Sequence, residues 1–377
     1  MTFTFIHTAD WQLGKPFANF PSDLAGELAA ARFSAIGRIA AIAEKRGARH
    51  VLVAGDIFDA EDLSTNVLRR AMELMAVHAS ITWVLLPGNH DPARHGGVWD
   101  RVQRFGAPGN VVLALTDGAI TLGDGVAVLA APLTSKNPGR DPTQWMDAAP
   151  TADGTLRIGL AHGSVQGFGS NGESSVLIAR NRAETAGLAY LALGDWHGTT
   201  RVGPDTWYSG TPEPDRFPSN EPGHVLAVSV ARQGAVNVER IASADFAWAR
   251  LAATVNTTAD LSTIEAQFAA LGGTQSRALV RLALSGSLSL SEHADFDAWQ
   301  EVWSARLRYL EVDAVALAVR PTETDFDSLG SDGPLVEAAR KLAAVAANPA
   351  HADAAVAALA LQRLFGFAAE AAREAGT

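Results

Sequence analysis

Cysteine is absent from the 377 residues of this chain. A disulfide framework is therefore excluded, and any bound metal must be held by His, Asp, Glu, Asn or Gln. Long apolar runs are missing as well, since the most apolar late stretch, 352–361, is short and is followed by Gln362 and Arg363. A membrane span needs about 20 apolar residues, so we expect no membrane segment.

Positive charge is also scarce. The chain has 30 Lys and Arg against 41 Asp and Glu, which gives a formal net charge of −11. This balance argues against a protein that coats nucleic acid through bulk positive charge, although it allows a local basic groove. The opening residues carry neither a basic cluster nor an apolar core, so we expect no export signal and a cytoplasmic location.

What the chain does have is apolar residues arranged in short, alternating blocks. Hydrophobic residues make up 47% of the sequence, enough for a sizeable core. In the first 130 residues, strand-like runs at 3–7, 50–54 and 81–86 alternate with helix-like spacing at 24–46 and 63–78. This order is typical of βαβ units and predicts a largely parallel sheet.

Strand-like segments dominate the next part of the chain. They cover 111–115, 119–122, 126–131, 156–161, 190–193 and 224–230. We expect them to supply a second sheet packed on the first, so that the fold class is α/β with four layers in the order α/β/β/α. From about 244 the pattern predicts a small β-α-β-α-β module, followed by two alanine-rich helices at 335–347 and 352–372.

Four polar loops each follow an apolar strand, and each contains groups that bind metals. They are Asp10-Trp11-Gln12, Gly55-Asp56-Ile57-Phe58-Asp59, Gly88-Asn89-His90-Asp91 and Gly194-Asp195-Trp196-His197, and a fifth candidate is His162 at the end of the strand 158–161. Carboxylate and amide oxygens with imidazole suit Mn²⁺, Fe²⁺ or Mg²⁺. One such loop alone is typical of an ordinary turn or helix cap. Four in this order predict a metal centre at the carboxyl ends of the strands.

This ordered set resembles the calcineurin-like metallophosphoesterases, whose fingerprint is D-x-H, G-D-x-x-D, G-N-H-[DE], a later His and G-H-x-H. The resemblance covers about residues 1–240. The stretches Phe5–Gly14 and Trp207–Glu213 are similar to SbcD-like DNA repair exonucleases in particular. The resemblance implies three parts: a metallophosphoesterase sandwich at 1–243, a small α+β capping domain at 244–322, and a C-terminal helical segment at 333–377 that docks on an SbcC-like ATPase.

The resemblance also implies a role for each motif residue. It assigns a first ion to Asp10, Gln12, Asp56 and His197, and a second ion to Asp56, Asn89, His162 and Asp195. His90 would stabilise the transition state or protonate the departing oxygen, and Asp59 would orient His90. The implied cofactors are two divalent ions, with Mn²⁺ preferred and Fe²⁺ or Mg²⁺ as alternatives.

Two positions depart from the fingerprint. Gln12 stands where the family has His, and Asp195 stands where it has the first His of G-H-x-H. Glutamine is a weaker, neutral ligand, so the first ion should be held less tightly, while the added carboxylate favours Mn²⁺ or Mg²⁺. The two changes define either a nuclease with retuned metals or a weakened catalyst, and the residues leave both open.

The function that follows is hydrolysis of DNA by a divalent-metal-dependent phosphodiesterase of DNA repair, acting as an exonuclease or endonuclease. One alternative is a catalytically attenuated scaffold or DNA-binding subunit of an ATPase complex. Another is a phosphoesterase for small substrates. The expected partners are DNA, an SbcC-like ATPase subunit and, by resemblance alone, a second copy of the chain.

Overall fold

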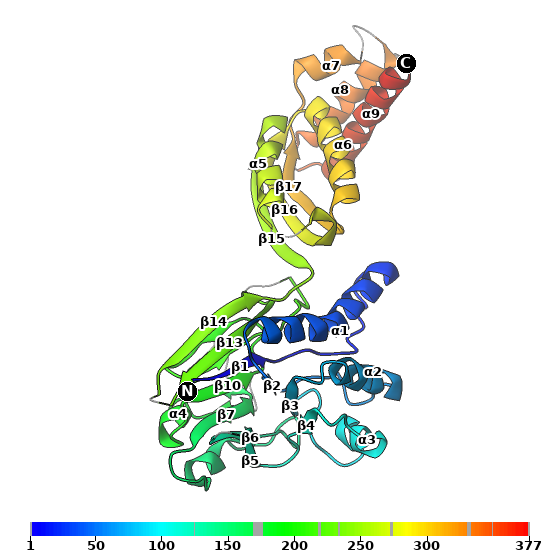
Figure 1. Cartoon of the computed structure of the whole chain (residues 1–377). Coiled ribbons are helices and arrows are strands. Elements are labelled where there is room, and N and C mark those ends of the chain that lie inside the picture. Colours follow the sequence, from blue (N-terminus) through cyan, green and yellow to red (C-terminus); the bar gives the residue numbers. More distant parts are fainter. Residues whose placement is uncertain are drawn as a thin grey trace. The chain divides into compact units, whose positions relative to one another are not determined.

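The computed structural model describes residues 2–123, 125–168, 176–217, 220–232, 234–271, 274–329, 333–348 and 350–375. The chain divides into two compact units, Met1–Phe246 and Ala247–Thr377 (Figure 1). The domain limits drawn from the sequence resemblance stay predictions.

The first sheet of the N-terminal unit has six strands in the order β14-β13-β1-β2-β3-β4. Their bounds are β1 Thr2–Thr8, β2 His50–Ala54, β3 Thr82–Leu86, β4 Val111–Leu113, β13 His224–Ala231 and β14 Val236–Ala242. Strands β1 to β4 run parallel, and β13 pairs antiparallel with β1. The segments 111–115 and 224–230, which we expected in the second sheet, therefore extend the first one.

Three helices cover one face of this sheet: α1 Ser22–Lys45, α2 Thr65–Ala76 and α3 Val98–Phe105 (Figure 1). Successive residues of a strand point to opposite faces, and β1 shows the result. Ile6 joins the core under the helices together with Ile36 and Ile39 of α1. Its neighbour Phe5 joins the core on the other face, against the second sheet.

The second sheet also has six strands, in the order β11-β12-β10-β7-β6-β5. Their bounds are β5 Gly118–Thr121, β6 Val126–Ala131, β7 Leu156–His162, β10 Tyr190–Gly194, β11 Thr200–Arg201 and β12 Thr206–Tyr208. Strands β8 Ser164–Val165 and β9 Leu177–Ile178 form a small separate pair. Val128, Ile158 and Tyr190 pack toward the first sheet.

The outer face of the second sheet has a thin cover. It consists of the 3₁₀ helix η1 Gln144–Ala148, the short helix α4 Arg182–Thr185 and adjoining loops, with Met146 and Leu188 in the core. The layers are thus helices, sheet, sheet and a thin helical layer. The predicted α/β/β/α sandwich is confirmed.

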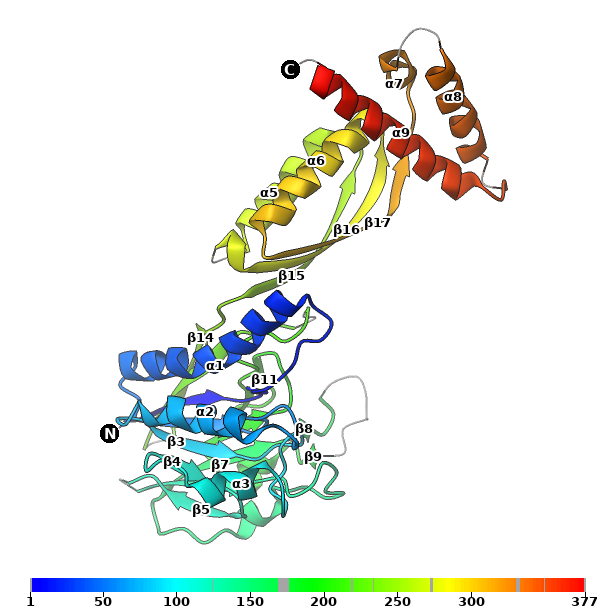
Figure 2. The same ribbon diagram turned by 90° about the vertical axis from the view of Figure 1, so that its right-hand side faces the viewer.

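The C-terminal unit is built on three parallel strands in the order β15-β16-β17. Its elements are β15 Ala247–Val255, η2 Thr258–Asp260, α5 Leu261–Ala269, η3 Gln275–Arg277, β16 Ala278–Leu288, α6 Leu290–Arg306, β17 Tyr309–Val319, α7 Glu323–Ser328, α8 Pro334–Ala346 and α9 Ala354–Ala375. Figure 2 shows α5 and α6 on one face of this sheet. Leu361 and Phe365 of α9 share a core with Leu290 of α6, so the last helix packs on the module.

Candidate metal centre

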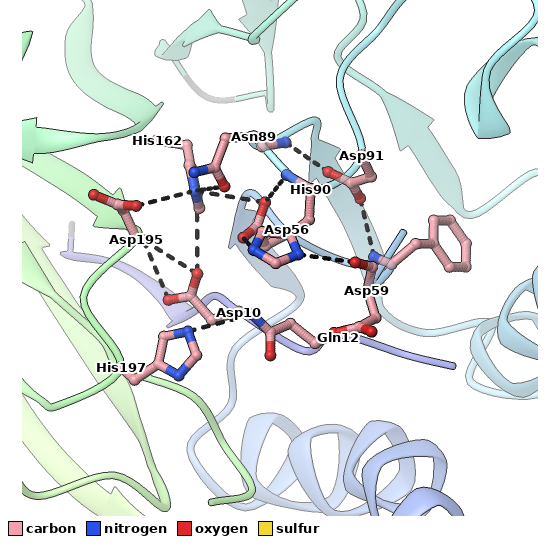
Figure 3. A network of polar contacts seen from close by, with 12 residues as sticks. Asp10, Gln12, Asp56, Asp59, Asn89, His90, Asp91, His162, Asp195 and His197 are labelled. Atoms are coloured by element: carbon pink, nitrogen blue, oxygen red, sulfur yellow. Dashed lines mark hydrogen bonds and ion pairs between the residues drawn. The ribbon is translucent and has the colours of Figure 1, made fainter. Parts of the chain in front are cut away.

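The polar loops meet because both large sheets end at the same place. Asp10 follows β1 and Asp56 follows β2, while His162 ends β7 and Asp195 follows β10 (Figure 3). These strands are parallel within each sheet, and Gly194 lies level with His162 in the pairing of β10 with β7. The Asp195 N–H donates to Asp10 Oδ1 at 3.1 Å, which joins the two sheets at this edge.

Three buried side chains form the tightest group of ligand atoms. Atoms of Asp10, Asp56 and His162 all lie within 4.8 Å of one another. His162 Nε2 is 3.5 Å from Asp56 Oδ1, and His162 Nδ1 is 4.0 Å from Asp10 Oδ1. Among the described residues, no other group of three His, Asp or Glu side chains meets this spacing. We call these three side chains the acidic cluster.

The orientation of His162 suits a metal ligand. Its Nδ1 donates to the Ala54 carbonyl at 2.8 Å, because a carbonyl oxygen can only accept. Its Nε2 therefore faces oxygens: Asn89 Oδ1 at 3.3 Å and Asp195 Oδ1 at 3.9 Å, besides Asp56. A backbone acceptor at one imidazole nitrogen and a cluster of oxygens at the other is the usual setting of a histidine ligand.

The electrostatics of the cluster favour a cation. Burial raises the pKa of Asp10 to about 6, although His197 and His162 oppose the change. Burial also acts to lower the pKa of His162, but Asp56, Asp10 and Asp195 outweigh it and raise that pKa to about 9. The site thus stabilises positive charge in a place without water contact. Oxygen-rich donors with one imidazole fit a divalent ion of the Mn²⁺, Fe²⁺ or Mg²⁺ class.

Backbone strain is concentrated at the same loops. Five non-glycine residues of the described chain have positive φ, and four of them are the predicted ligands Asp10, Gln12, Asp56 and Asp195, with φ of 55°, 43°, 53° and 104°. Left-handed backbone is costly for residues with a Cβ and is characteristic of functional sites. Gly194 adds to the fit, because a Cβ there would collide with the Ala54 carbonyl. A glycine is needed where the two sheets approach this closely.

His90 lies at the open side of the acidic cluster. Its backbone N–H donates to Asp56 Oδ1 at 2.9 Å, and its side chain is 44% exposed. Its Nδ1 donates to the backbone carbonyl of Asp59 at 2.8 Å, which leaves Nε2 3.9 Å from Asp56 Oδ2. Asp59 contacts His90 through its main-chain carbonyl, while its carboxylate lies 3.7 Å from Lys15 Nζ.

Gln12 and His197 lie together beside the acidic cluster. Gln12 Nε2 is 3.3 Å from His197 Nε2, and the Gln12 side chain is buried. Two further residues complete this region: Lys15, with Nζ 3.0 Å from Gln12 Oε1, and Asp215, with Oδ1 3.1 Å from His197 Nδ1. Burial acts to raise the pKa of Asp215, but hydrogen bonding to His197 and nearby positive charges lower it well below the usual range.

Several residues that shape the site are not identified by the sequence motifs. Asp91 is fully buried and accepts hydrogen bonds from the N–H groups of Gly88 and Phe58, which fixes the shape of the Asn89–His90 loop. Ser164 donates to Asp195 Oδ2 at 2.8 Å. Asp91 is visible in the motif as a carboxylate without an assigned role. Ser164 carries no signal in the sequence.

Arg32 of α1 is another missed residue, and it is almost completely buried. Its guanidinium donates to the carbonyls of Trp11 at 2.6 Å, Asp10 at 3.1 Å and Glu213 at 2.8 Å. It therefore ties the loop that carries Asp10 and Gln12 to the loop that leads to Asp215. An arginine in the middle of an amphipathic helix looks like a surface residue in sequence.

Comparison with known proteins fits this geometry. Residues 3–227, more than half of the chain, match the model of a family described as calcineurin-like phosphoesterase. The chain belongs to this family. The family implies metal-dependent hydrolysis of phosphoesters, and the acidic cluster supplies a candidate site for its divalent ions.

Other comparisons add little. No curated protein matches the sequence significantly. The crystal structure of TT1561 of Thermus thermophilus aligns with 64% of this chain and 99% of that chain, at a TM-score of 0.40 and 10% identity. A likeness of this degree carries no argument about function. None of these findings names SbcD-like nucleases. In the described part of the chain, no helix has the length and apolar character of a membrane span.

Proposed function

We propose that this protein is a divalent-metal-dependent phosphodiesterase that hydrolyses DNA, in the manner of SbcD-like nucleases. The observation that carries the proposal is the pairing of a buried acidic cluster with a half-exposed imidazole. Asp10, Asp56 and His162 are withdrawn from water, while His90 stands open to a substrate directly beside Asp56. A cation site with an adjacent acid or base group is what phosphodiester hydrolysis requires.

The residues of the acidic cluster fit a divalent ion. Asp10, Asp56 and His162 would hold a cation. Asn89 and Asp195 lie close enough to His162 to supply further ligands to the same cation. We propose Mn²⁺ in preference to Fe²⁺ or Mg²⁺. When bound, divalent cations offset the charge of a phosphate and activate water for in-line attack.

His90 has a defined proton arrangement. Because its Nδ1–H donates to the Asp59 carbonyl, any proton that it gives to a substrate must come from Nε2. Asp56 Oδ2 lies 3.9 Å from this Nε2 atom. His90 can therefore donate its Nε2 proton to the departing oxygen of a phosphodiester, or stabilise charge that develops on the phosphate.

DNA as the substrate is supported by the two SbcD-like stretches and by the small second unit, whose elements follow the order expected of a capping module. We also propose an SbcC-like ATPase subunit as a partner. The C-terminal helix α9 leaves three large apolar side chains exposed, Val356 at 66%, Leu359 at 52% and Phe367 at 67%, and a partner helix would cover them. A homodimer is a further proposal that rests on resemblance alone.

The test compares oligonucleotide cleavage with hydrolysis of bis-p-nitrophenyl phosphate in Mn²⁺. We expect cleavage of labelled single- and double-stranded oligonucleotides, reduced about 10²–10⁴-fold in His90→Ala and abolished in Asp56→Ala. His95→Ala is the matched control, since the His95 side chain is fully exposed on the next loop.

Two outcomes would contradict the proposal. Unchanged cleavage in both site variants would remove the acidic cluster and His90 from the chemistry. Turnover of the small phosphodiester with intact oligonucleotides would favour the small-substrate alternative.

A further inference from the structure

Four polar side chains close into a ring beside the acidic cluster. Lys15 Nζ lies 3.0 Å from Gln12 Oε1, and Gln12 Nε2 lies 3.3 Å from His197 Nε2. His197 Nδ1 lies 3.1 Å from Asp215 Oδ1, and Asp215 Oδ2 returns to Lys15 Nζ at 3.0 Å. The ring is largely withdrawn from solvent, with exposed side-chain fractions of 3% for Asp215, 12% for His197 and 24% for Lys15.

The chemistry of Lys15 fixes the direction of each hydrogen bond in this ring. An ammonium group only donates, so the Gln12 atom beside it is the amide oxygen, and the amide nitrogen faces His197. That nitrogen donates, so His197 Nε2 must accept and the ring proton sits on Nδ1. Nδ1 then donates to the Asp215 carboxylate. Arg216 Nη2 lies 3.2 Å from the same Nδ1, but its side chain is 67% exposed and pairs with Asp215.

The hydrogen bonds of this ring occupy two of the ligand atoms that the family resemblance assigns to the first ion. The Gln12 oxygen accepts from Lys15, and the His197 Nε2 lone pair accepts from Gln12. A divalent ion here would have to break both bonds and lie close to the Lys15 ammonium. The acidic cluster differs: within the described residues, no Lys or Arg forms an ion pair with Asp10, Asp56 or Asp195.

We propose that the centre binds one divalent ion tightly, at the acidic cluster, and that the Lys15 ring takes the place of the other ion. This inference rests on the proposed metal-dependent function. The Lys15 ammonium is the fixed positive charge of that half of the site, and it holds Gln12 and His197 in their mutual bond. The pairing of Gln12 with Lys15 thus makes this family member a one-ion centre.

The experiment counts the ions bound by the full-length chain. Chelator-treated protein is titrated with MnCl₂ by calorimetry, and metal content is measured after equilibrium dialysis. We expect one ion per chain, with any second ion bound at least 100-fold more weakly. The double variant Gln12→His, Lys15→Met restores an imidazole and removes the ammonium, so it should bind two ions. Lys45→Met, which changes an exposed lysine of α1, should still bind one.

Each outcome separates this inference from the function on which it rests. Two ions of similar affinity in the unaltered protein, or one ion in the double variant, would overturn the one-ion centre while leaving phosphodiester hydrolysis standing. His162→Ala should remove the single tight ion. A folded protein that binds no Mn²⁺ and cleaves no oligonucleotide would overturn the proposed function as well.

Discussion

Two regions of the molecule shift the pKa of a buried imidazole in opposite directions. One is the interior between the two large sheets, and the other is the edge where the carboxyl ends of their strands meet. His7 of β1 is fully buried between the sheets, with Nδ1 3.0 Å from the Tyr190 hydroxyl and Nε2 3.1 Å from the Leu193 carbonyl. Burial lowers its pKa to about 3, against the opposing Leu193 bond. His162 is equally buried at the edge, and its pKa is about 9.

Neighbouring carboxylates account for the difference between the pKa values of His7 and His162. Around His7 the neighbours are neutral, so desolvation decides and the ring stays uncharged. Around His162 the negative charges of Asp56, Asp10 and Asp195 exceed the cost of desolvation. One pair of sheets thus provides an interior that excludes charge and an edge that concentrates negative charge. A cation site needs both, because the rigid apolar interior holds the edge loops in strained positions.

The largest effect on stability should come from Arg32, which holds the loops at the carboxyl edge of the first sheet in place. Arg32→Met removes the donor to three buried carbonyl groups, those of Trp11, Asp10 and Glu213. Each buried group that loses its partner costs about 1–3 kcal/mol, so the free energy of unfolding should fall by about 3 kcal/mol or more. Chemical denaturation monitored by circular dichroism, in chelator, measures this change.

Arg46→Met is the control for this prediction. Arg46 follows the last turn of the same helix, where it pairs with Glu239 at the surface, and its loss should leave stability nearly unchanged. Equal losses in the two variants would mean that Arg32 does not brace the edge loops.

The sequence predicts the layers well, and it places the polar loops directly after strands, because both features depend on local pattern. Apolar periodicity locates the strands that precede Asp10, Asp56 and Asn89, and parallel strands bring such loops to one edge. Periodicity does not show which sheet a strand joins. The sequence therefore assigns the segments of β4 and β13 to the second sheet, whereas both strands lie in the first. Strand pairing over such sequence distances is decided by packing that no local window contains.

The rest of the site escaped prediction for the same reason. Lys15 follows Gln12 closely in sequence, but its role appears only when Asp215, two hundred residues later, is placed beside it. Arg32 likewise gains meaning from the carbonyl of Glu213. Metal motifs report residues that touch an ion. They do not identify the cations and backbone contacts that surround those residues.

The interior side of the comparison predicts a dependence on pH. A folded pKa of about 3 for His7, against 6.5 in the unfolded chain, means that only the unfolded state takes up this proton between those values. Stability from His7 is therefore complete above pH 6.5 and is lost as the pH falls toward 3. Relative to His7→Asn, the protein should lose about 2–3 kcal/mol of unfolding free energy between pH 7.5 and pH 4.5.

Denaturation curves for the two proteins across this pH range test the prediction. Other titrating groups contribute equally to both proteins, so the difference between their plots of unfolding free energy against pH reports His7 alone. Parallel curves would show that His7 binds its proton equally well in the folded and unfolded states. The interior would then not exclude charge as the structure implies.

The smallest effect concerns the outermost carboxylate of the edge. Ser164 Oγ donates to Asp195 Oδ2 at 2.8 Å, and the other carboxylate oxygen lies 3.9 Å from His162 Nε2. Ser164→Ala frees this carboxylate to rotate, so the affinity for Mn²⁺ should fall about tenfold. Ser164→Thr keeps the hydroxyl and should bind nearly as the unaltered protein does.

Calorimetric titration with MnCl₂ measures both variants, with Ser34→Ala as a control, since the Ser34 hydroxyl donates to the carbonyl of Ala30 on an exposed face of α1. If Ser164→Ala bound Mn²⁺ as tightly as the unaltered protein, Asp195 would not be held in place for the ion. The negative charge that sets the edge apart from the interior would then come from Asp10 and Asp56 alone. The departure from the family fingerprint at Asp195 would have no bearing on metal affinity.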